Sequence, residues 1–184
     1  MIFNIPGMAA DDSGTYKLIS KTTLTVATKE VNIPLPSGYS RYKLTCYGYN
    51  TSRSNIDDGL YVGVKSGGTR RNATAWGGTS YRSGGSSYAI GIEQNKYLLL
   101  PRGNILGENV SEMDVIVDGN KTRVLSKTIA GMADSTGDMG DHVVTLIVKE
   151  YVYNYSIDEL SIGTMNSAYT ISAGSTFILE GMKE

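Results

Sequence analysis

The sequence predicts an all-β fold: an antiparallel β-sandwich, jelly-roll-like, with a short extended N-terminal arm. Short runs of β-branched and aromatic residues recur at a spacing of about 8–12 residues, as in sandwiches and barrels. Gly, Pro, Asn, Asp and Ser, the usual turn residues, separate these runs. No window shows a helical period with capping residues. The 184 residues include 22 glycines and 13 tyrosines, a composition that suits many strands and turns.

Strands are expected where β-forming residues alternate with polar ones or form short apolar runs. In chain order, these ranges are 16–26, 30–35, 41–49, 59–65, 88–93, 96–101, 111–117, 122–130, 142–153, 157–163 and 175–181. The first two are expected to pair with each other. Pro34 and Pro36 favour a sheet edge or a strand end for the second, because proline cannot donate a ladder hydrogen bond.

Side-chain alternation predicts which face of a strand is buried. Cys46 is the single cysteine, so no internal disulfide can form. It shares a face with Leu44 and is expected to be a small buried apolar residue. In the last strand, Phe177 and Leu179 are expected to point into the core, and Gly181 allows a close approach of neighbouring groups.

Residues 66–87 are rich in glycine and serine and are expected to form a long loop. This loop contains residue types that are enriched where surfaces bind proteins or sugars. The candidate partner-binding residues here are Arg70, Arg71, Trp76, Tyr81 and Arg82. The alternative is an ordinary inter-strand loop whose Trp76 packs back into the core.

Residues 1–14 are expected to form the extended arm, and residues 15–184 the β-sandwich domain. The arm contains the apolar residues Ile2, Phe3 and Ile5, and the turn-forming residues that follow separate them from the domain. Apolar side chains outside a folded domain usually dock on another surface. These three residues are therefore further candidates for partner contacts.

The closing segment, SAGSTFILEGMK, resembles the ending of a broad group of bacteriophage virion structural proteins of the jelly-roll-like β-sandwich type, whose last strand follows the pattern AGStF-L-G-K. Four earlier phrases are similar to strands of that group in the same order: KLISKTTLTVATKEVNIPL, SGYSRYKLTCYGYNT, DDGLYVGVKSGGT and YSIDELSI. Glu180 stands where tyrosine is usual, and Met182 where isoleucine is common. Members of the group occur on tail fibres and as small stand-alone virion proteins.

The resemblance implies a structural role in a phage virion. A capsid decoration or cement protein is the first choice, because the chain is short, lacks a fibre shaft and carries an arm suited to clamping a neighbour. The alternative is a tail-fibre or baseplate adhesin module that binds a host cell-surface glycan through the 66–88 loop. Expected partners are other virion proteins, either the major capsid protein or tail proteins, and further copies of the chain. The resemblance suggests a trimer as one such homo-oligomer.

Composition argues against several other classes of function. The formal net charge of −1 offers no global attraction for nucleic acid or anionic membrane. No apolar run reaches the roughly 18–20 residues that a membrane-spanning helix needs. No signal peptide is recognised, so the protein is expected to be made in the cytoplasm of the bacterial host and to function in the virion.

No enzyme activity, cofactor or metal site is expected. The single histidine, His142, is not accompanied by a nucleophile motif. Glu112 and Asp114 share a strand face at about 7 Å, near the separation that glycosidases use, although alternating acids are more typical of a solvent face. A weaker third hypothesis, a glycan-processing enzyme, rests on this pair and on Asp158 with Glu159. Three further acids punctuate the loop at 131–141 without an EF-hand spacing: Asp134, Asp138 and Asp141.

Overall fold

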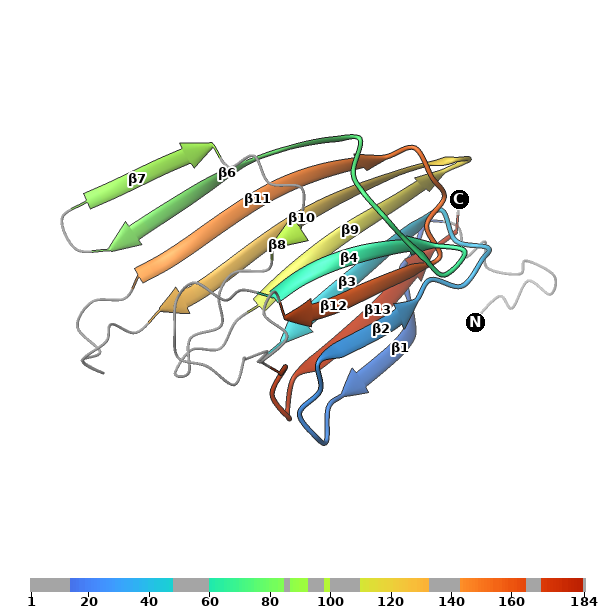
Figure 1. Cartoon of the computed structure of the whole chain (residues 1–184), viewed down its shortest axis with the longest axis horizontal. Coiled ribbons are helices and arrows are strands. Elements are labelled where there is room, and N and C mark those ends of the chain that lie inside the picture. Colours follow the sequence, from blue (N-terminus) through green and yellow to red (C-terminus); the bar gives the residue numbers. More distant parts are fainter. Residues whose placement is uncertain are drawn as a thin grey trace, which may run out of the picture.

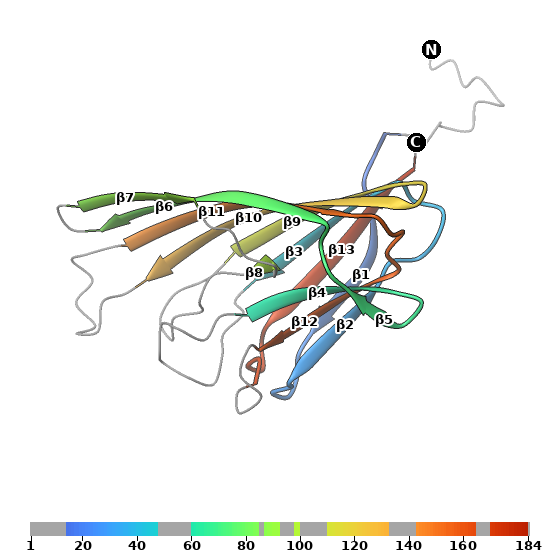
Figure 2. The same ribbon diagram turned by 45° about the horizontal axis from the view of Figure 1, so that its top comes forward.

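The chain folds into two antiparallel β-sheets packed face to face, as the computed structural model in Figures 1 and 2 shows. The structure describes residues 14–47, 60–84, 87–92, 98–99, 110–132, 143–164 and 170–183. Within these ranges no residue is helical. The predicted all-β sandwich is therefore confirmed.

In the described part of the chain, the larger sheet has eight strands and the smaller sheet has five. The larger sheet has the order β1 (Lys17–Thr23), β13 (Thr176–Met182), β3 (Arg41–Tyr47), β9 (Val110–Asp118), β10 (Lys121–Met132), β11 (Val143–Tyr153), β6 (Ala75–Gly84) and β7 (Ser87–Ile92). The smaller sheet has the order β2 (Glu30–Pro34), β12 (Glu159–Thr164), β4 (Leu60–Ser66) and β5 (Thr69–Arg71), and β8 (Leu98–Leu99) also pairs with β4.

The chain crosses repeatedly between the sheets, as in jelly rolls. The predicted pairing of the first two strands is wrong, because β1 pairs with β13 and β2 pairs with β12. Backbone hydrogen bonds hold the connecting segment against the residues before β13: Leu24 N donates to Ser175 O, and Thr28 pairs with Ile171. The predicted edge position of Pro34 is confirmed, since β2 is the outermost strand of the smaller sheet.

The two sheets differ in extent. In Figures 1 and 2 the smaller sheet covers the part of the larger sheet around β1, β13 and β3, whereas β6 and β7 extend beyond it. The core lies between the sheets and is built from the alternate residues of each strand that face inward. Its buried residues include Val31, Ile33, Leu44, Cys46, Val62, Val64, Met113, Val115, Val124, Tyr151, Leu160, Ile162, Phe177 and Leu179.

The closing strand occupies an internal position in the larger sheet, between β1 and β3. Phe177 and Leu179 are each 1% exposed, as the alternation predicted. A Cβ on Gly181 would lie 2.5 Å from Tyr39 Cδ1 and 2.6 Å from Ile19 Cδ1. The expected close approach at Gly181 is thus confirmed, and the approaching groups are the side chains of Tyr39 and Ile19.

A buried tyrosine secures the connection between the sheets that precedes β3. The Tyr42 side chain is 3% exposed, and its hydroxyl donates to the carbonyl oxygen of Pro36 at 2.5 Å. Burial raises the pKa of Tyr42 above its ordinary value, so the hydroxyl keeps its proton and remains a donor.

The predicted long loop at 66–87 is wrong for most of its length. Gly67 and Gly68, both with positive φ, form the turn of a tight hairpin between β4 and β5. Residues 75–84 form β6, which pairs with β11 from Ala75 to Ser83 and with β7 on its other side. The glycines and serines of β6 have low β-propensity, so the sequence alone does not predict a strand here. The long neighbouring strand β11 supplies the backbone hydrogen bonds of β6.

Candidate functional site

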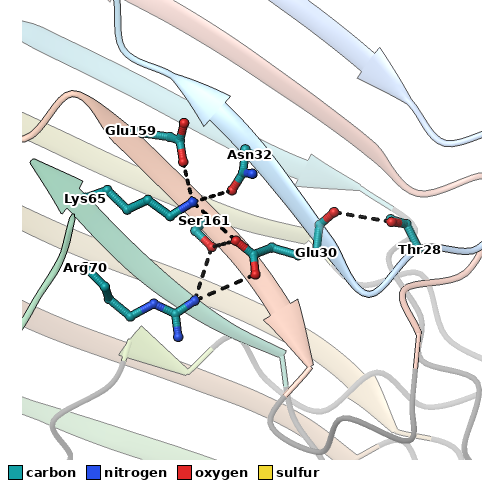
Figure 3. A network of polar contacts seen from close by, with 7 residues as sticks. All are labelled: Thr28, Glu30, Asn32, Lys65, Arg70, Glu159 and Ser161. Atoms are coloured by element: carbon teal, nitrogen blue, oxygen red, sulfur yellow. Dashed lines mark hydrogen bonds and ion pairs between the residues drawn. The ribbon is translucent and has the colours of Figure 1, made fainter. Parts of the chain in front are cut away.

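The outer face of the smaller sheet carries a network of polar contacts, shown in Figure 3. Its centre is Lys65 on β4, whose side chain is 18% exposed. Lys65 Nζ donates to Glu159 Oε1 at 2.6 Å, to Asn32 Oδ1 at 3.0 Å and to Glu30 Oε1 at 3.3 Å. One ammonium group therefore links the three neighbouring strands β2, β12 and β4.

Arg70 on β5 extends the network across the sheet. Its Nη2 lies 3.4 Å from Ser161 Oγ and 3.8 Å from Glu30 Oε2 (Figure 3). The side chain passes over Gly63 of β4, where an added Cβ would stand 3.1 Å from Arg70 Nε. Ser161, although on the outer face, is fully buried. A side chain at position 63 would obstruct this path, which explains a glycine in the middle of a strand.

The charges of the network balance, with two carboxylates facing two cations. Ser161 Oγ donates to Glu30 Oε1 at 2.6 Å. This hydrogen bond, assisted by Lys65, lowers the pKa of Glu30 below its ordinary value. The hydrogen bond to Glu159 raises the pKa of Lys65. The contacts between these carboxylates and cations join β2, β12, β4 and β5, which makes the network a link between strands.

Arg71, the second predicted arginine, lies apart from this network. Its guanidinium carbon is 4.6 Å from the ring centroid of Tyr155, a cation–π contact. Its Nε is buried and has no hydrogen-bond partner in the structure. The two neighbouring arginines therefore serve different contacts, one over the smaller sheet and one against the residues that follow β11.

The other predicted residues of this region, Trp76, Tyr81 and Arg82, lie on β6 in the larger sheet. The register pairs Trp76 with Tyr151, which faces the interior, and pairs Tyr81 with Leu146. Positions 76 and 82 share one face of the strand, and position 81 belongs to the other. The five predicted residues are thus divided between the two sheets. Two lie in the smaller sheet, and the three on β6 are divided between the two faces of the larger sheet.

The predicted arm residues Ile2, Phe3 and Ile5 lie outside the described residues. The chain enters the described structure beside the closing strand, where Gly14 N donates to Lys183 O at 3.1 Å. A pocket of about 200 Å³ lies at this point, lined by Thr15, Lys17, Tyr39, Gly181 and Lys183. Lys183 Nζ lies 5.5 Å from the ring centroid of Tyr39.

The residues considered for catalysis lie in both sheets or outside the described ranges. Glu159 belongs to the Lys65 network of the smaller sheet, and Asp158 Oδ2 accepts a hydrogen bond from Gly67 N at 2.7 Å. Glu112 pairs with Lys43 at 3.1 Å, and Asp114 with Lys127 at 3.9 Å, as in a solvated ion-paired surface. Burial raises the pKa of the Cys46 thiol, so it stays protonated. His142 and the three acids of the 131–141 loop fall outside the described residues.

The residues that the structure describes contain no group of three or more potential metal ligands. They also contain no helix that is long and apolar enough to cross a membrane.

Sequence reasoning missed the network around Lys65. Its members alternate with buried residues on their own strands, as Glu30 and Asn32 do with Val31 and Ile33. This alternation marks them as outward-facing residues, but nothing in the sequence says which strands are neighbours. The order β2-β12-β4-β5 was the missing information.

Comparison with known proteins assigns no family to this fold. No family model matches the chain, and no curated protein matches it.

Proposed function

We propose that the protein is a structural component of a bacteriophage virion and functions as a capsid decoration or cement protein. The observation that carries the proposal is the place of the closing strand. The segment that resembles the virion proteins forms β13, an internal strand of the larger sheet with Phe177 and Leu179 in the core. The residues of the resemblance are thus residues that hold the sandwich together.

Such a protein acts by binding the assembled shell more tightly than its separate subunits, which stabilises the assembled state. This role requires a rigid body with surfaces for contacts, and it needs no catalytic group. Ion pairs between neighbouring strands reinforce the outer faces of both sheets, as between Lys65 and Glu159 and between Lys43 and Glu112. These contacts suit a body that keeps its shape at an interface.

One edge strand of each sheet, β1 and β2, is unsuited to edge-to-edge pairing, which favours contacts through faces or through the arm. The edge strand β1 carries Lys17 and Lys21, and its register to β13 shifts around Ile19. The edge strand β2 ends at Pro34. Lysine, proline and register shifts at edge strands hinder edge-to-edge pairing and aggregation. A protein crowded on a capsid benefits from such protection.

Binding to purified capsids that lack the protein tests the proposal. The full chain is expected to co-sediment with these capsids, whereas a chain without residues 1–13 is expected to bind more weakly. A variant with serine at Ile2, Phe3 and Ile5 keeps the length of the arm but removes its apolar side chains. It therefore tests whether the arm binds through these side chains. Failure of the full chain to bind capsids would contradict the decoration role, and unchanged binding of both variants would contradict the role of the arm.

The second candidate, a tail-fibre or baseplate adhesin that binds a host glycan, is favoured by one observation. Strands β6 and β7, which carry Trp76, Tyr81 and Arg82, lie at the end of the larger sheet that extends beyond the smaller one (Figure 2). Trp76→Ala and Tyr81→Ala, on opposite faces of β6, identify which face binds host cells. If neither variant reduces binding to cells, the adhesin hypothesis fails.

A further inference from the structure

The strand β1 lies at one end of the larger sheet and, among the described strands, pairs with β13 alone (Figure 1). None of its seven residues is buried, and Leu18 is 65% exposed. The edge strand β2 differs, because it places Val31 and Ile33 in the core at 7% and 4% exposure. β1 is therefore an edge strand that adds little to the core of the sandwich.

The side chains of β1 that face the core are small and polar. Ser20 lies opposite Leu179, and Thr22 lies opposite Phe177, so Ser20 and Thr22 share the inner face with these two core residues. Ile19, at the register shift, is partly buried and packs against the core. Apart from Ile19, β1 contributes backbone hydrogen bonds to the sandwich rather than core residues.

The chain is fixed just after β1 but is loosely packed where β1 begins. Immediately after the strand, Leu24 N donates to Ser175 O at 2.9 Å, and Leu24 O accepts from Gly174 N at 2.7 Å. At the start of the strand, Thr15 and Lys17 line the pocket of about 200 Å³, so the packing there is incomplete. The hinge for a movement of β1 is therefore its junction with Leu24.

Release of β1 would uncover the edge of β13. Phe177 and Leu179 anchor β13 in the core, and β13 also pairs with β3, so β13 stays in place when β1 leaves. Its backbone groups toward β1 would then lack partners, and such an edge pairs readily with another strand. The structure shows which strand fits this edge, because β1 itself fills it with six residue pairs.

We propose that β1 exchanges between copies of this chain, so that β1 of one copy pairs with β13 of a second copy. The exchanged ladder repeats the contacts seen within one copy, so it needs no new complementary surface. In a reciprocal pair each copy donates one strand and accepts one, which leaves neither β13 edge unpaired.

The sparse anchoring of β1 keeps the free energy of its opening low, and opening is the step that exchange requires. Pairing within one copy is favoured at low concentration, and pairing between copies gains population as the concentration rises. The outer edge of β1, which carries Lys17 and Lys21, takes no part, because the exchange uses the edge that faces β13.

A mixed disulfide between two variants tests the exchange. Thr23 and Thr176 are direct partners whose hydroxyl oxygens lie 2.9 Å apart, which suits a disulfide across the two strands. Thr23→Cys and Thr176→Cys are made in separate proteins, mixed and oxidised mildly. A disulfide between the two chains, identified by mass spectrometry of the linked peptides, is expected to increase with concentration. Cys46 is buried and does not compete.

The matched control keeps the same acceptor position. Tyr47 lies opposite Thr176 on the other side of β13, in the internal strand β3. Both Tyr47 and Thr23 are exposed, so chance collisions affect the two mixtures alike. Tyr47→Cys mixed with Thr176→Cys is expected to give about tenfold less mixed disulfide or lower still, because an internal strand does not open alone.

A single chain that carries both Thr23→Cys and Thr176→Cys should close the bond internally at low concentration. Failure of this closure would contradict the ladder that the exchange reuses and would overturn the inference. Equal linkage in the test and control mixtures, or no linkage with Thr23→Cys at any concentration, would overturn it as well.

Hydrogen exchange of the wild-type protein provides a second test that requires no cysteine. The amides of β1 are expected to exchange at least about tenfold faster than those of the internal strands β3 and β9. Ile19→Ser should accelerate this exchange and the formation of the mixed disulfide by about tenfold, because it removes the apolar anchor. Leu18→Ser, at the adjacent exposed residue, is the control and should change both rates by less than about twofold. Equal protection of β1 and β3, or equal effects of the two serine variants, would contradict a detachable β1.

The inference goes beyond the proposed virion role and does not depend on it. The mixed disulfide reports pairing between copies of the purified protein, whereas co-sedimentation with capsids reports the function. Exchange without binding to capsids would leave the role of β1 assigned and refute the decoration role. Binding to capsids without exchange would refute the exchange and support the decoration role.

Discussion

Tyr39 and Gly181 approach so closely that a single added methyl group would not fit between them. Tyr39 Cδ1 stands 2.5 Å from the position of a Cβ at residue 181, and Ile19 Cδ1 stands at 2.6 Å on the same carbon. Two side chains from separate parts of the chain thus close over the backbone of the last strand. This packing joins Ile19 of β1 and Gly181 of β13 to Tyr39, which lies just before β3.

Gly181→Ala is expected to lower the free energy of unfolding by about 1–3 kcal/mol, the usual cost of overpacking a filled site. Urea denaturation measures this change. Glu180→Ala, at the next position and on the outer face, is the control and should change stability by less than about 0.5 kcal/mol. In an Ile19→Ala background the cost of Gly181→Ala should shrink. If the losses of unfolding free energy caused by the two substitutions are additive in the double variant, the proposed clash is contradicted.

Lys65→Met should destabilise the sandwich by about 1 kcal/mol at low salt, because Glu30 and Glu159 lose their shared ammonium partner. The cost should decrease at high salt, which screens the interactions of surface charges. The control is Lys21→Met on the edge strand β1. Equal effects of the two substitutions, or no dependence on salt, would show that the network contributes nothing measurable.

Removal of the Ser161 hydroxyl should reduce stability in a pH-dependent manner. The hydrogen bond from Ser161 holds the pKa of Glu30 below its ordinary value of 4.5. Its contribution is therefore fully present above about pH 4.5 and is lost as the pH falls through the folded-state pKa. Ser161→Ala should cost about 1 kcal/mol at pH 7, a figure discounted because Glu30 is 37% exposed, and less at pH 3. A larger cost at pH 3 than at pH 7 would reverse the expected sign.

The Cys46 thiol should resist modification in the folded protein. It is fully buried, and burial raises its pKa, so the reactive thiolate does not form under native conditions. Labelling with a thiol reagent is expected to be very slow in buffer and complete in denaturant. Rapid labelling in buffer, with the fold intact by circular dichroism, would contradict the buried position.

Residues with strong local signals allowed much of the fold to be predicted from the sequence. The alternation of Phe177 and Leu179 identified the buried face of the last strand, and Pro34 identified an edge strand. Both signals depend on one strand at a time. The false loop at 66–87 arose because the glycines and serines of β6 carry little β-propensity, and its strand forms by pairing with β11.

The candidate surfaces were harder to predict because they depend on which strands are neighbours. Lys65 and Glu159 are far apart in the chain and meet only through the pairing of β4 with β12. The position of Val110 opposite Ile129 similarly depends on the pairing of β9 with β10. Neither relationship leaves a local mark in the sequence. The resemblance of the closing segment to phage virion proteins stays a prediction, and it pointed to no surface.

The central claim is the proposed role in a phage virion, and its most direct test is a cryo-electron microscopy map of intact virions of the phage proposed to encode the protein. The proposed function predicts density that fits this sandwich on the outside of the capsid, with the 1–13 segment directed toward a neighbouring subunit. Density at the tail tip instead would support the adhesin alternative and contradict the decoration role. A map and a proteome of purified virions that both lack the protein would contradict a virion structural function altogether.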